Sequence, residues 1–557
     1  MDDEVLLLIK KLALLNAVKH NGKANPGAIV GGVIGTFPDL RSQIKQVMPK
    51  INELVAEINS LDFESQEKQL LEIDPDALEN KNEKRGIFDF LNIKEGEQII
   101  TAFPPGPEKY PHIGHAKACL VNYLLAKSYN GKFILRFEDT NPDLVRSEFY
   151  DIMQEDFKWL GVEWDDLVYA SDYMDLYYGH CEKLIRSGDV YVCDCSPEEI
   201  KKGRETGESC SCRGLSVEDN LKRWAEMMLS AQGSFIARLK IDLKHKNSTM
   251  RDPTIFRIID KEHARQGKKY RVWPNYDFQN SIMDGFLKVT HRIRSKEFEM
   301  RNELQRYLQN LLGYNETNIF EFGRFNLKGV EASGRIIREK VNLGELIGWD
   351  DPSLTTLRAL RRRGFLAEAI KNFVISTGIT KNEPVLTWDD LILHNKRLLD
   401  ASANRYFFVD SPVDVRVSGA PHKEFSLNLN PSIKGGERKF VSNDFFFISK
   451  NDFNELEEGS LYRFMECFNV RYLAGSVLEF VDEDIDTYRR SGVGMLHYLP
   501  KDMDLVSVSV LMPDKSVKKG FAEPLVRNVS VGDVVQFERF GFCRLDNKEN
   551  FSFWFTH

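Results

Sequence analysis

Two histidines, His112 and His115, surround one glycine in the pentapeptide PHIGH at residues 111–115. The preceding segment QIITAF (98–103) is a β-rich run, and the following segment AKACLVNYLLAKSYNGK (116–132) has a helical pattern. A helix that starts after a strand offers free N–H groups and a partial positive charge, which favour phosphate. Two imidazoles at that point could donate hydrogen bonds to a phosphorus centre as negative charge develops. The spacing alone also fits two ordinary surface or core histidines.

Four of the eight cysteines fall within one stretch of 20 residues, CDCSPEEIKKGRETGESCSC at 193–212. They form two C-x-C pairs, Cys193 with Cys195 and Cys210 with Cys212. Four thiolates in two close pairs suit a tetrahedral structural Zn²⁺, and four reduced thiols in a loop are the alternative. The remaining cysteines are scattered, which is not the pattern of a secreted disulfide framework.

The stretch RALRRRG (358–364) places Arg361, Arg362 and Arg363 in one short predicted helix. These arginines could contact nucleic-acid phosphates, or they could form a solvated helix face. The formal net charge of −8 does not decide between the two, because a local basic stripe matters more than the total.

The elements that must position these residues indicate several domains, since 557 residues are too many for one core. Strands alternate with helices on both sides of an interruption that contains the cysteines, which predicts a parallel sheet with an insertion. Helices precede this α/β region and follow it, a charged stretch at 79–86 is predicted to be a linker, and short alternating runs near the end predict antiparallel barrels. The predicted boundaries are 1–90 (helical), 97–190 (first α/β half), 191–272 (insertion), 273–325 (second α/β half), 326–395 (helical) and 396–557 (β-rich).

The longest apolar run near the N-terminus, VLLLIKKLALL at 5–15, is interrupted by two lysines and is too short to span a bilayer. It also lacks a small-residue cleavage site. The sequence therefore predicts a cytoplasmic protein with no membrane partner.

The segment FPPGPEKYPHIGHAKA (103–118), followed by FILRFEDTNP (133–142), resembles the opening of class I aminoacyl-tRNA synthetases. Within them it is most similar to the glutamyl and glutaminyl enzymes, and the chain is identified as a member of the archaeal glutamyl type. Further matching segments are GKANPGAIVGGVIG (22–35), MRDPTIFRI (250–258), WPNYDFQNSIMD (273–284), GWDDPSLTTLRALRRRG (348–364) and GFAEP (520–524).

The resemblance implies a reaction of ATP, as its Mg²⁺ complex, with L-glutamate to give an adenylate, followed by transfer to tRNA(Glu); tRNA(Gln) is a further candidate. It implies a Rossmann-like catalytic core, an acceptor-binding insertion that the possible zinc would shape, a helical stem-contact region and a β-barrel anticodon-binding domain. The basic helix would then contact tRNA.

The resemblance also implies the binding residues. Glu138 would receive the amino group of the substrate, Tyr276 and Asn280 would line the same pocket, and Arg294 would pair with the side-chain carboxylate. A guanidinium binds a carboxylate in two places, whereas an amide offers it no compensating charge. ATP would contact Pro105, Gly114 and Arg324; Gly114 lacks a side chain, so a flat ring could pack against its backbone.

Two positions depart from the family pattern. The family usually has an arginine two residues before the paired prolines that helps to bind the side-chain carboxylate, and this chain has Ala102 there. Arg294 would then bind the carboxylate largely alone, or another base such as Lys109 would contribute. In the mobile loop EASGRIIREK (331–340), Gly334 stands where the family has a lysine that stabilises the triphosphate, and Arg335 is the first candidate to replace it. These departures keep a non-catalytic tRNA-binding paralogue open as an alternative. A glutaminyl-tRNA synthetase is the other alternative, and Arg294 opposes it.

Overall fold

The structure is a computed structural model that describes residues 3–19, 22–37, 44–74, 86–94, 96–331, 333–431 and 436–557. The chain divides into two compact units, Met1–Ile93 and Lys94–His557. Within the described ranges, no helix is both long enough and apolar enough to cross a membrane.

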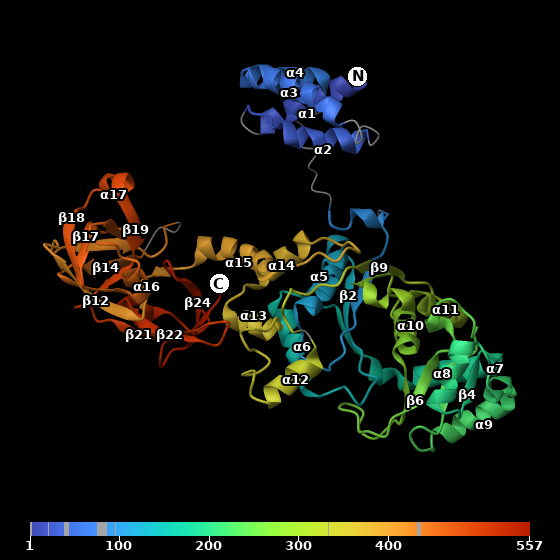
Figure 1. Ribbon diagram of the computed structural model, residues 1–557. Helices are drawn as coiled ribbons and strands as arrows, with labels where there is room; N and C mark the ends of the chain where they lie inside the picture. Colours follow the sequence, from blue (N-terminus) through green and yellow to red (C-terminus); the bar gives the residue numbers. More distant parts are fainter. Residues whose placement is uncertain are drawn as a thin grey trace. The chain divides into compact units, whose positions relative to one another are not determined.

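The first unit consists of packed helices, coloured blue in Figure 1. They are α1 (Asp3–Lys19), α2 (Pro26–Thr36), α3 (Ile44–Asn59) and α4 (Phe63–Ile73), followed by the short 3₁₀ helix η2 (Asp89–Leu91). Helix α2 begins where Asn25 accepts a hydrogen bond from the Gly27 N–H and Pro26 fixes the first turn. Apolar residues of all four helices, among them Ile9, Ile51 and Leu70, form one core. Residues 79–85 of the predicted linker lie outside the described residues.

A parallel five-stranded sheet forms the centre of the second unit. Its strands are β1 (Ile100–Phe103), β2 (Lys132–Phe137), β3 (Asp166–Tyr169), β8 (His291–Ser295) and β9 (Asn318–Phe322), in the order β3-β2-β1-β8-β9. All four neighbouring pairs are parallel, as the alternation of strands and helices predicts. The strand order reverses between β1 and β8, so ligands are expected in the crevice at the carboxyl ends of these two strands.

The helices α5 (Ile113–Ser128), α6 (Glu148–Trp159), α10 (Tyr276–Phe286) and α11 (Asn302–Leu312) belong to this α/β core. Helix α5 follows β1 directly and covers one face of the sheet, where the Thr101 hydroxyl donates to the carbonyl of Asn122 at 2.8 Å. Helix α10 lies on the other face, because Asp284 on α10 pairs with Arg136 on β2 at 2.8 Å.

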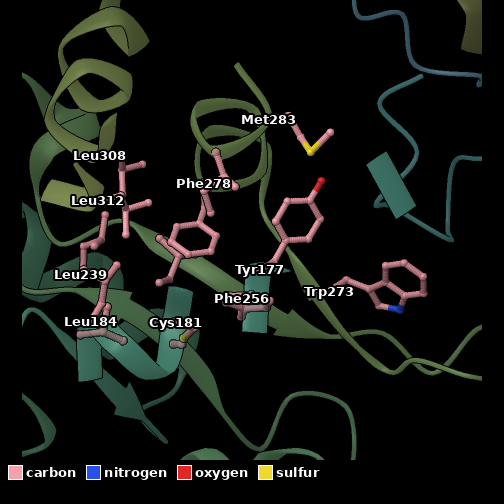
Figure 2. Close-up of a cluster of buried hydrophobic side chains, with 14 of the residues drawn as sticks. Tyr177, Cys181, Leu184, Leu239, Phe256, Trp273, Phe278, Met283, Leu308 and Leu312 are labelled. Carbon is pink, nitrogen blue, oxygen red and sulfur yellow. The ribbon is translucent and has the colours of Figure 1, made fainter. Parts of the chain in front are cut away.

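The segment between the two halves of the α/β core begins earlier than the predicted boundary at 191. It contains η3 (Ala170–Tyr173), α7 (Met174–Ser187), β4 (Val190–Cys193), α8 (Pro197–Thr206), η4 (Ser211–Gly214), α9 (Val217–Met227), β5 (Ile236–Leu239), η5 (Ser248–Met250), β6 (Thr254–Ile258) and β7 (Val272–Pro274). The four strands form an antiparallel sheet in chain order. Figure 2 shows that Phe256 and Trp273 of this sheet share a core with Phe278 and Met283 of α10, so the insertion packs directly on the α/β core.

The short 3₁₀ helix η6 (Lys296–Arg301) lies between β8 and α11. The segment after β9 is helical. It contains α12 (Gly334–Asn342), α13 (Leu357–Arg363), α14 (Ala367–Ser376) and α15 (Trp388–Ser402). Helix α13 begins where the Thr356 hydroxyl accepts from the Ala359 N–H at 3.1 Å, and it ends at Gly364, whose φ of 95° suits a residue without a side chain.

Short strands dominate the C-terminal part. One seven-stranded sheet has the order β10-β23-β24-β25-β21-β22-β11, a second has the order β19-β16-β17-β18-β12-β15-β20, and β13 and β14 form a separate hairpin. The elements are β10 (Arg405–Tyr406), β11 (Phe408–Asp410), β12 (Pro412–Ser418), β13 (Glu424–Asn428), β14 (Glu437–Val441), β15 (Phe445–Ser449), α16 (Lys450–Asn454), β16 (Leu461–Phe464), β17 (Asn469–Ala474), β18 (Val477–Asp482), α17 (Ile485–Ser491), β19 (Gly492–Leu496), β20 (Tyr498–Pro500), β21 (Val506–Leu511), β22 (Val517–Ala522), η7 (Pro524–Asn528), β23 (Val534–Phe537), β24 (Gly541–Asn547) and β25 (Ser552–Phe555).

The predicted antiparallel arrangement is wrong for four strand pairs of these sheets. The pairs β10–β23, β12–β18, β16–β19 and β21–β25 are parallel. An alternating apolar pattern marks a strand with one buried face in either arrangement, so the sequence could not reveal the direction of a partner far along the chain.

Candidate active site

A cavity of about 650 Å³ opens at the carboxyl ends of β1, β2, β8 and β9. Of the residues predicted for the adenylate-forming site, eight line this cavity: Pro105, His112, Gly114, His115, Glu138, Tyr276, Arg294 and Arg324. The location agrees with the reversal of strand order between β1 and β8.

The two histidines cap the first turn of α5. The Nδ1 atom of His112 accepts a hydrogen bond from the Gly114 N–H at 3.0 Å, and the Nδ1 atom of His115 accepts from the His112 N–H at 3.2 Å. The ring centroids lie 4.1 Å apart. Because each Nδ1 is an acceptor, each neutral ring carries its proton on Nε2, and that N–H is the donor available to a ligand.

Both imidazoles are held in the neutral form. Burial lowers the pKa of His112 to about 3, with a smaller contribution from the positive charge of Lys109. Burial also lowers the pKa of His115 well below its usual value, and His112 and Lys109 add to the effect. The two rings therefore act at neutral pH as hydrogen-bond donors without a charge of their own, beside a helix N-terminus that supplies a partial positive charge.

Gly114 leaves the backbone of the first helical turn accessible. A Cβ atom at this position would lie 2.8 Å from Cε1 of His112 and 3.2 Å from the carbonyl oxygen of Phe325. Any other residue would displace the capping imidazole, so glycine is required by the packing as well as by access to the backbone.

Glu138 lies directly after β2, and one of its two carboxylate oxygens is already used. Oε1 accepts from Nε of Arg136 at 2.9 Å and from Nδ2 of Asn280 at 3.2 Å, whereas Oε2 is buried without a hydrogen-bond partner among the described residues. Burial raises the pKa of Glu138, and the guanidiniums of Arg136 and Arg292 oppose this shift. The free oxygen at a cavity wall fits a ligand ammonium group. Asn280 is placed behind Glu138 and does not line the cavity.

Arg294 lies on β8, and most of its guanidinium donors have no hydrogen-bond partner among the described residues. It is 6% exposed, and Nη2 donates to the side-chain oxygen of Asn302. Its Nε and Nη1 atoms are buried and lack hydrogen-bond partners among the described residues. A buried cation with unused donors at a cavity wall is arranged for a ligand anion. Tyr276, the first residue of α10, faces the same cavity.

Sequence reasoning missed several residues that line this cavity, among them Arg257, Gln279 and Arg292. Arg292 lies two residues before Arg294 on the same strand, and alternation along a strand puts residues i and i+2 on one face. That rule could have indicated Arg292 once HRIRS was recognised as a strand.

Ala102 is fully buried in the core of β1 and provides no polar group. Lys109, the base suggested as its substitute, lines the cavity, but it lies on the side of the two histidines, whose pKa values it lowers. Arg324 lines the cavity from the segment after β9 and pairs with Glu297 at 3.4 Å on the surface.

Arg335 lies in the first turn of α12 and is exposed; it does not line the cavity. The start of α12 is nonetheless close to the histidine motif, since a Cβ atom on Gly334 would lie 2.8 Å from Cδ of Lys109. Arg338, one turn later, donates to the carbonyl of Glu108 at 3.2 Å.

The four cysteines of the insertion form one cluster. Their Sγ atoms all lie within 4.8 Å of one another, with Cys193 and Cys210 at 3.9 Å and Cys195 and Cys212 at 3.8 Å. A tetrahedral ion with Zn–S bonds of about 2.3 Å separates its sulfur ligands by roughly 3.8 Å. The donor set and spacing therefore fit Zn²⁺.

The structure separates the three arginines of α13. Arg361 is exposed. Arg362 forms ion pairs with Asp546 at 2.7 Å and Asp350 at 2.6 Å, and Arg363 is 4% exposed and donates to the carbonyls of Pro352 and Thr556 at 3.0 and 2.8 Å. Arg362 and Arg363 thus join α13 to the C-terminal strands. Arg361 is the exposed one of the three, and its guanidinium lies over the ring of Trp159.

A cavity at a strand-order switch, with two histidines capping the helix that follows β1, is the arrangement implied by the resemblance to class I aminoacyl-tRNA synthetases. Residues 98–401 match the family described as tRNA synthetases class I (E and Q), catalytic domain, and residues 403–483 and 495–546 match its two anticodon-binding domains. The chain belongs to this family of glutamyl and glutaminyl enzymes.

The chain is also similar to curated relatives over nearly its whole length. It is 38% identical to a glutamate–tRNA ligase of Pyrococcus furiosus and 40% identical to one of Pyrococcus abyssi, with 98% of each chain covered in both comparisons. A glutamate–tRNA ligase of Methanocaldococcus jannaschii is 38% identical, with 99% of each chain covered.

Proposed function

We propose that this protein is an archaeal-type glutamate–tRNA ligase. It joins L-glutamate to AMP with release of diphosphate and then transfers the glutamyl group to the 3′ end of tRNA(Glu). The proposed activity takes place in the cytoplasm. The relatives named above support glutamate as the amino acid, and they support neither a glutaminyl enzyme nor a non-catalytic paralogue. They also give no support for tRNA(Gln) as a second substrate.

The observation that carries this proposal is the placement of opposite charges in one cavity. Glu138 offers a free carboxylate oxygen at one position, and Arg294 offers unused guanidinium donors at another. Glutamate carries an ammonium group and a side-chain carboxylate, which match this pair. Glutamine would match Glu138 but would leave the charge of Arg294 buried without compensation.

The phosphates of ATP, bound as its Mg²⁺ complex, are proposed to lie at the N-terminus of α5, next to Pro105 and Gly114. The α-carboxylate of glutamate attacks the α-phosphorus, and diphosphate leaves. The Nε2–H groups of His112 and His115 donate to the phosphoryl oxygens as charge develops there. Since both rings are neutral before the reaction, they stabilise that charge through fixed dipoles rather than by transferring a proton. Arg324 and, from α12, Arg335 are proposed to contact the nucleotide.

A structural zinc ion is proposed for the insertion, held by Cys193, Cys195, Cys210 and Cys212. When bound, the ion would cross-link β4 to η4 and fix the shape of the insertion that meets the acceptor end of tRNA. Arg361 on α13 is proposed to contact tRNA phosphates, and the C-terminal sheets are proposed to close as barrels that bind the anticodon.

The test is to measure which amino acid the purified protein attaches to tRNA(Glu) and to tRNA(Gln) in the presence of ATP and Mg²⁺. Attachment of glutamate to tRNA(Glu) is expected. Attachment of glutamine alone would establish the glutaminyl alternative, and attachment of neither would establish the non-catalytic one.

A further inference from the structure

Three arginines lie on one face of the central sheet, packed against α10. Arg136 is on β2, and Arg292 and Arg294 are on β8. All three are buried, with exposures of 0%, 1% and 6%. Two buried carboxylates, Glu138 and Asp284, lie among them.

The position beside Arg292 on the neighbouring strand is Ala102. Thr101 on β1 pairs with His291 on β8 in parallel register, so the next residues, Ala102 and Arg292, stand side by side on the same face. Ala102 is the position where the family usually has an arginine for the side-chain carboxylate. The chain therefore lacks a guanidinium on β1 and has one on β8, a single strand away.

Arg292 lines the cavity, although two of its guanidinium nitrogens contact Asn280 and Asp284, which do not line it. Nη1 donates to the side-chain oxygen of Asn280, Nη2 contacts Asp284, and Nε is buried without a hydrogen-bond partner among the described residues. Asn280 in turn donates to Glu138, the proposed ammonium ligand. Arg292 is thus linked through Asn280 to Glu138, and it lines the cavity together with Glu138 and Arg294.

The unused donors of this face favour a substrate with a second carboxylate. Nε of Arg292 and both Nε and Nη1 of Arg294 are buried without hydrogen-bond partners among the described residues. The side-chain carboxylate of glutamate accepts hydrogen bonds from such donors and compensates their charge, whereas the amide of glutamine carries no charge.

We infer that Arg292 is the second specificity-determining guanidinium of this enzyme and takes the place of the arginine missing at Ala102. With Arg294 it forms a two-arginine site for the side-chain carboxylate of the amino acid. This inference rests on the proposed function. It assigns the missing charge to Arg292 rather than to Lys109, which lies at the histidine end of the cavity.

The experiment relocates the charge between the two strands. Arg292→Val, Ala102→Arg with Arg292→Val, Arg292→Lys and the unchanged protein are compared for kcat/KM with glutamate and with glutamine, at saturating tRNA and ATP. Arg292→Val should lower kcat/KM for glutamate by about 10²-fold or more, with a much smaller loss for glutamine and an unchanged KM for ATP. The double variant should recover at least about tenfold of the loss for glutamate. Arg306→Gln, an exposed residue on α11, is the matched control.

Two results would overturn the inference. If Arg292→Val lowers both amino acids equally and Ala102→Arg restores neither, Arg292 only holds Asn280 and Asp284 in place. If Arg292→Val does not fold, Arg292→Lys decides: lysine keeps the charge but not the planar fork, so the preference for glutamate over glutamine should fall by about tenfold, and an unchanged preference would refute the inference. Failure of the unchanged protein to charge tRNA with glutamate would refute the proposed function itself.

Discussion

Replacement of Arg294 by cysteine tests whether Arg294 binds the side-chain carboxylate of glutamate. The structure predicts a large effect on glutamate and a small effect on folding. Arg294 is buried, and its side chain donates one hydrogen bond within the described residues, to Oδ1 of Asn302. The change removes that bond, while Nδ2 of Asn302 keeps its hydrogen bond to Glu321. The two unused guanidinium nitrogens mean that the side chain serves the ligand more than the fold.

The magnitude follows from the cost of leaving one partner of a buried charge pair without the other, about 3–5 kcal/mol. At about 1.4 kcal/mol per factor of ten, this corresponds to a loss of about 10²- to 10³-fold or more in kcat/KM for glutamate. Because Arg292 remains two residues away on the same face, we expect the lower end of this range. Glutamine needs no countercharge and should lose much less.

The assay is amino-acid activation with saturating tRNA, measured separately for glutamate and glutamine, with Arg306→Gln as the control. The melting temperature of each variant shows whether the protein is folded. An unchanged ratio of glutamate to glutamine in a folded Arg294→Cys variant would place the carboxylate partner elsewhere.

Three further perturbations test other parts of the structure. His115→Ala should lower kcat by about 10²-fold or more with little change in KM for ATP, measured by ATP–diphosphate exchange, and a normal rate would remove the histidine from the mechanism. The purified protein should contain about one zinc per chain by elemental analysis and Cys195→Ser should contain less; absence of zinc in protein prepared without chelators would leave only thiols. Lys117 on α5 is 4% exposed, and burial lowers its pKa to about 8 from 10.5. The unfolded chain therefore binds more protons between pH 8 and 10.5, so stability should rise with pH in that window. Lys117→Met should abolish this rise, because it removes the buried charge together with its hydrogen bond to Thr377 and its contacts with the rings of Phe322 and Phe325. Melting curves that keep the same pH dependence would contradict this.

The sequence by itself indicated the position of the histidine motif and the class of the core. A strand, a proline-rich turn and a helix are local features, and the position of His112 and His115 at the helix start follows from them. The two C-x-C pairs also indicated a candidate metal site, because the spacing within each pair is a local feature of the sequence. The sequence also showed that an insertion divides the α/β core, since the alternation of strands and helices stops and resumes.

The tertiary structure decided which distant residues act together. Ala102 and Arg292 are 190 residues apart in sequence and adjacent only because β1 pairs with β8 across the switch in strand order. Arg361, Arg362 and Arg363 look equivalent in the sequence, yet the contacts of α13 with the C-terminal strands bury one, pair another and expose the third. Periodicity fixes the face of a strand on which a side chain lies but not the strand beside it, and that neighbour determines whether a buried charge is satisfied by the protein or left for a ligand.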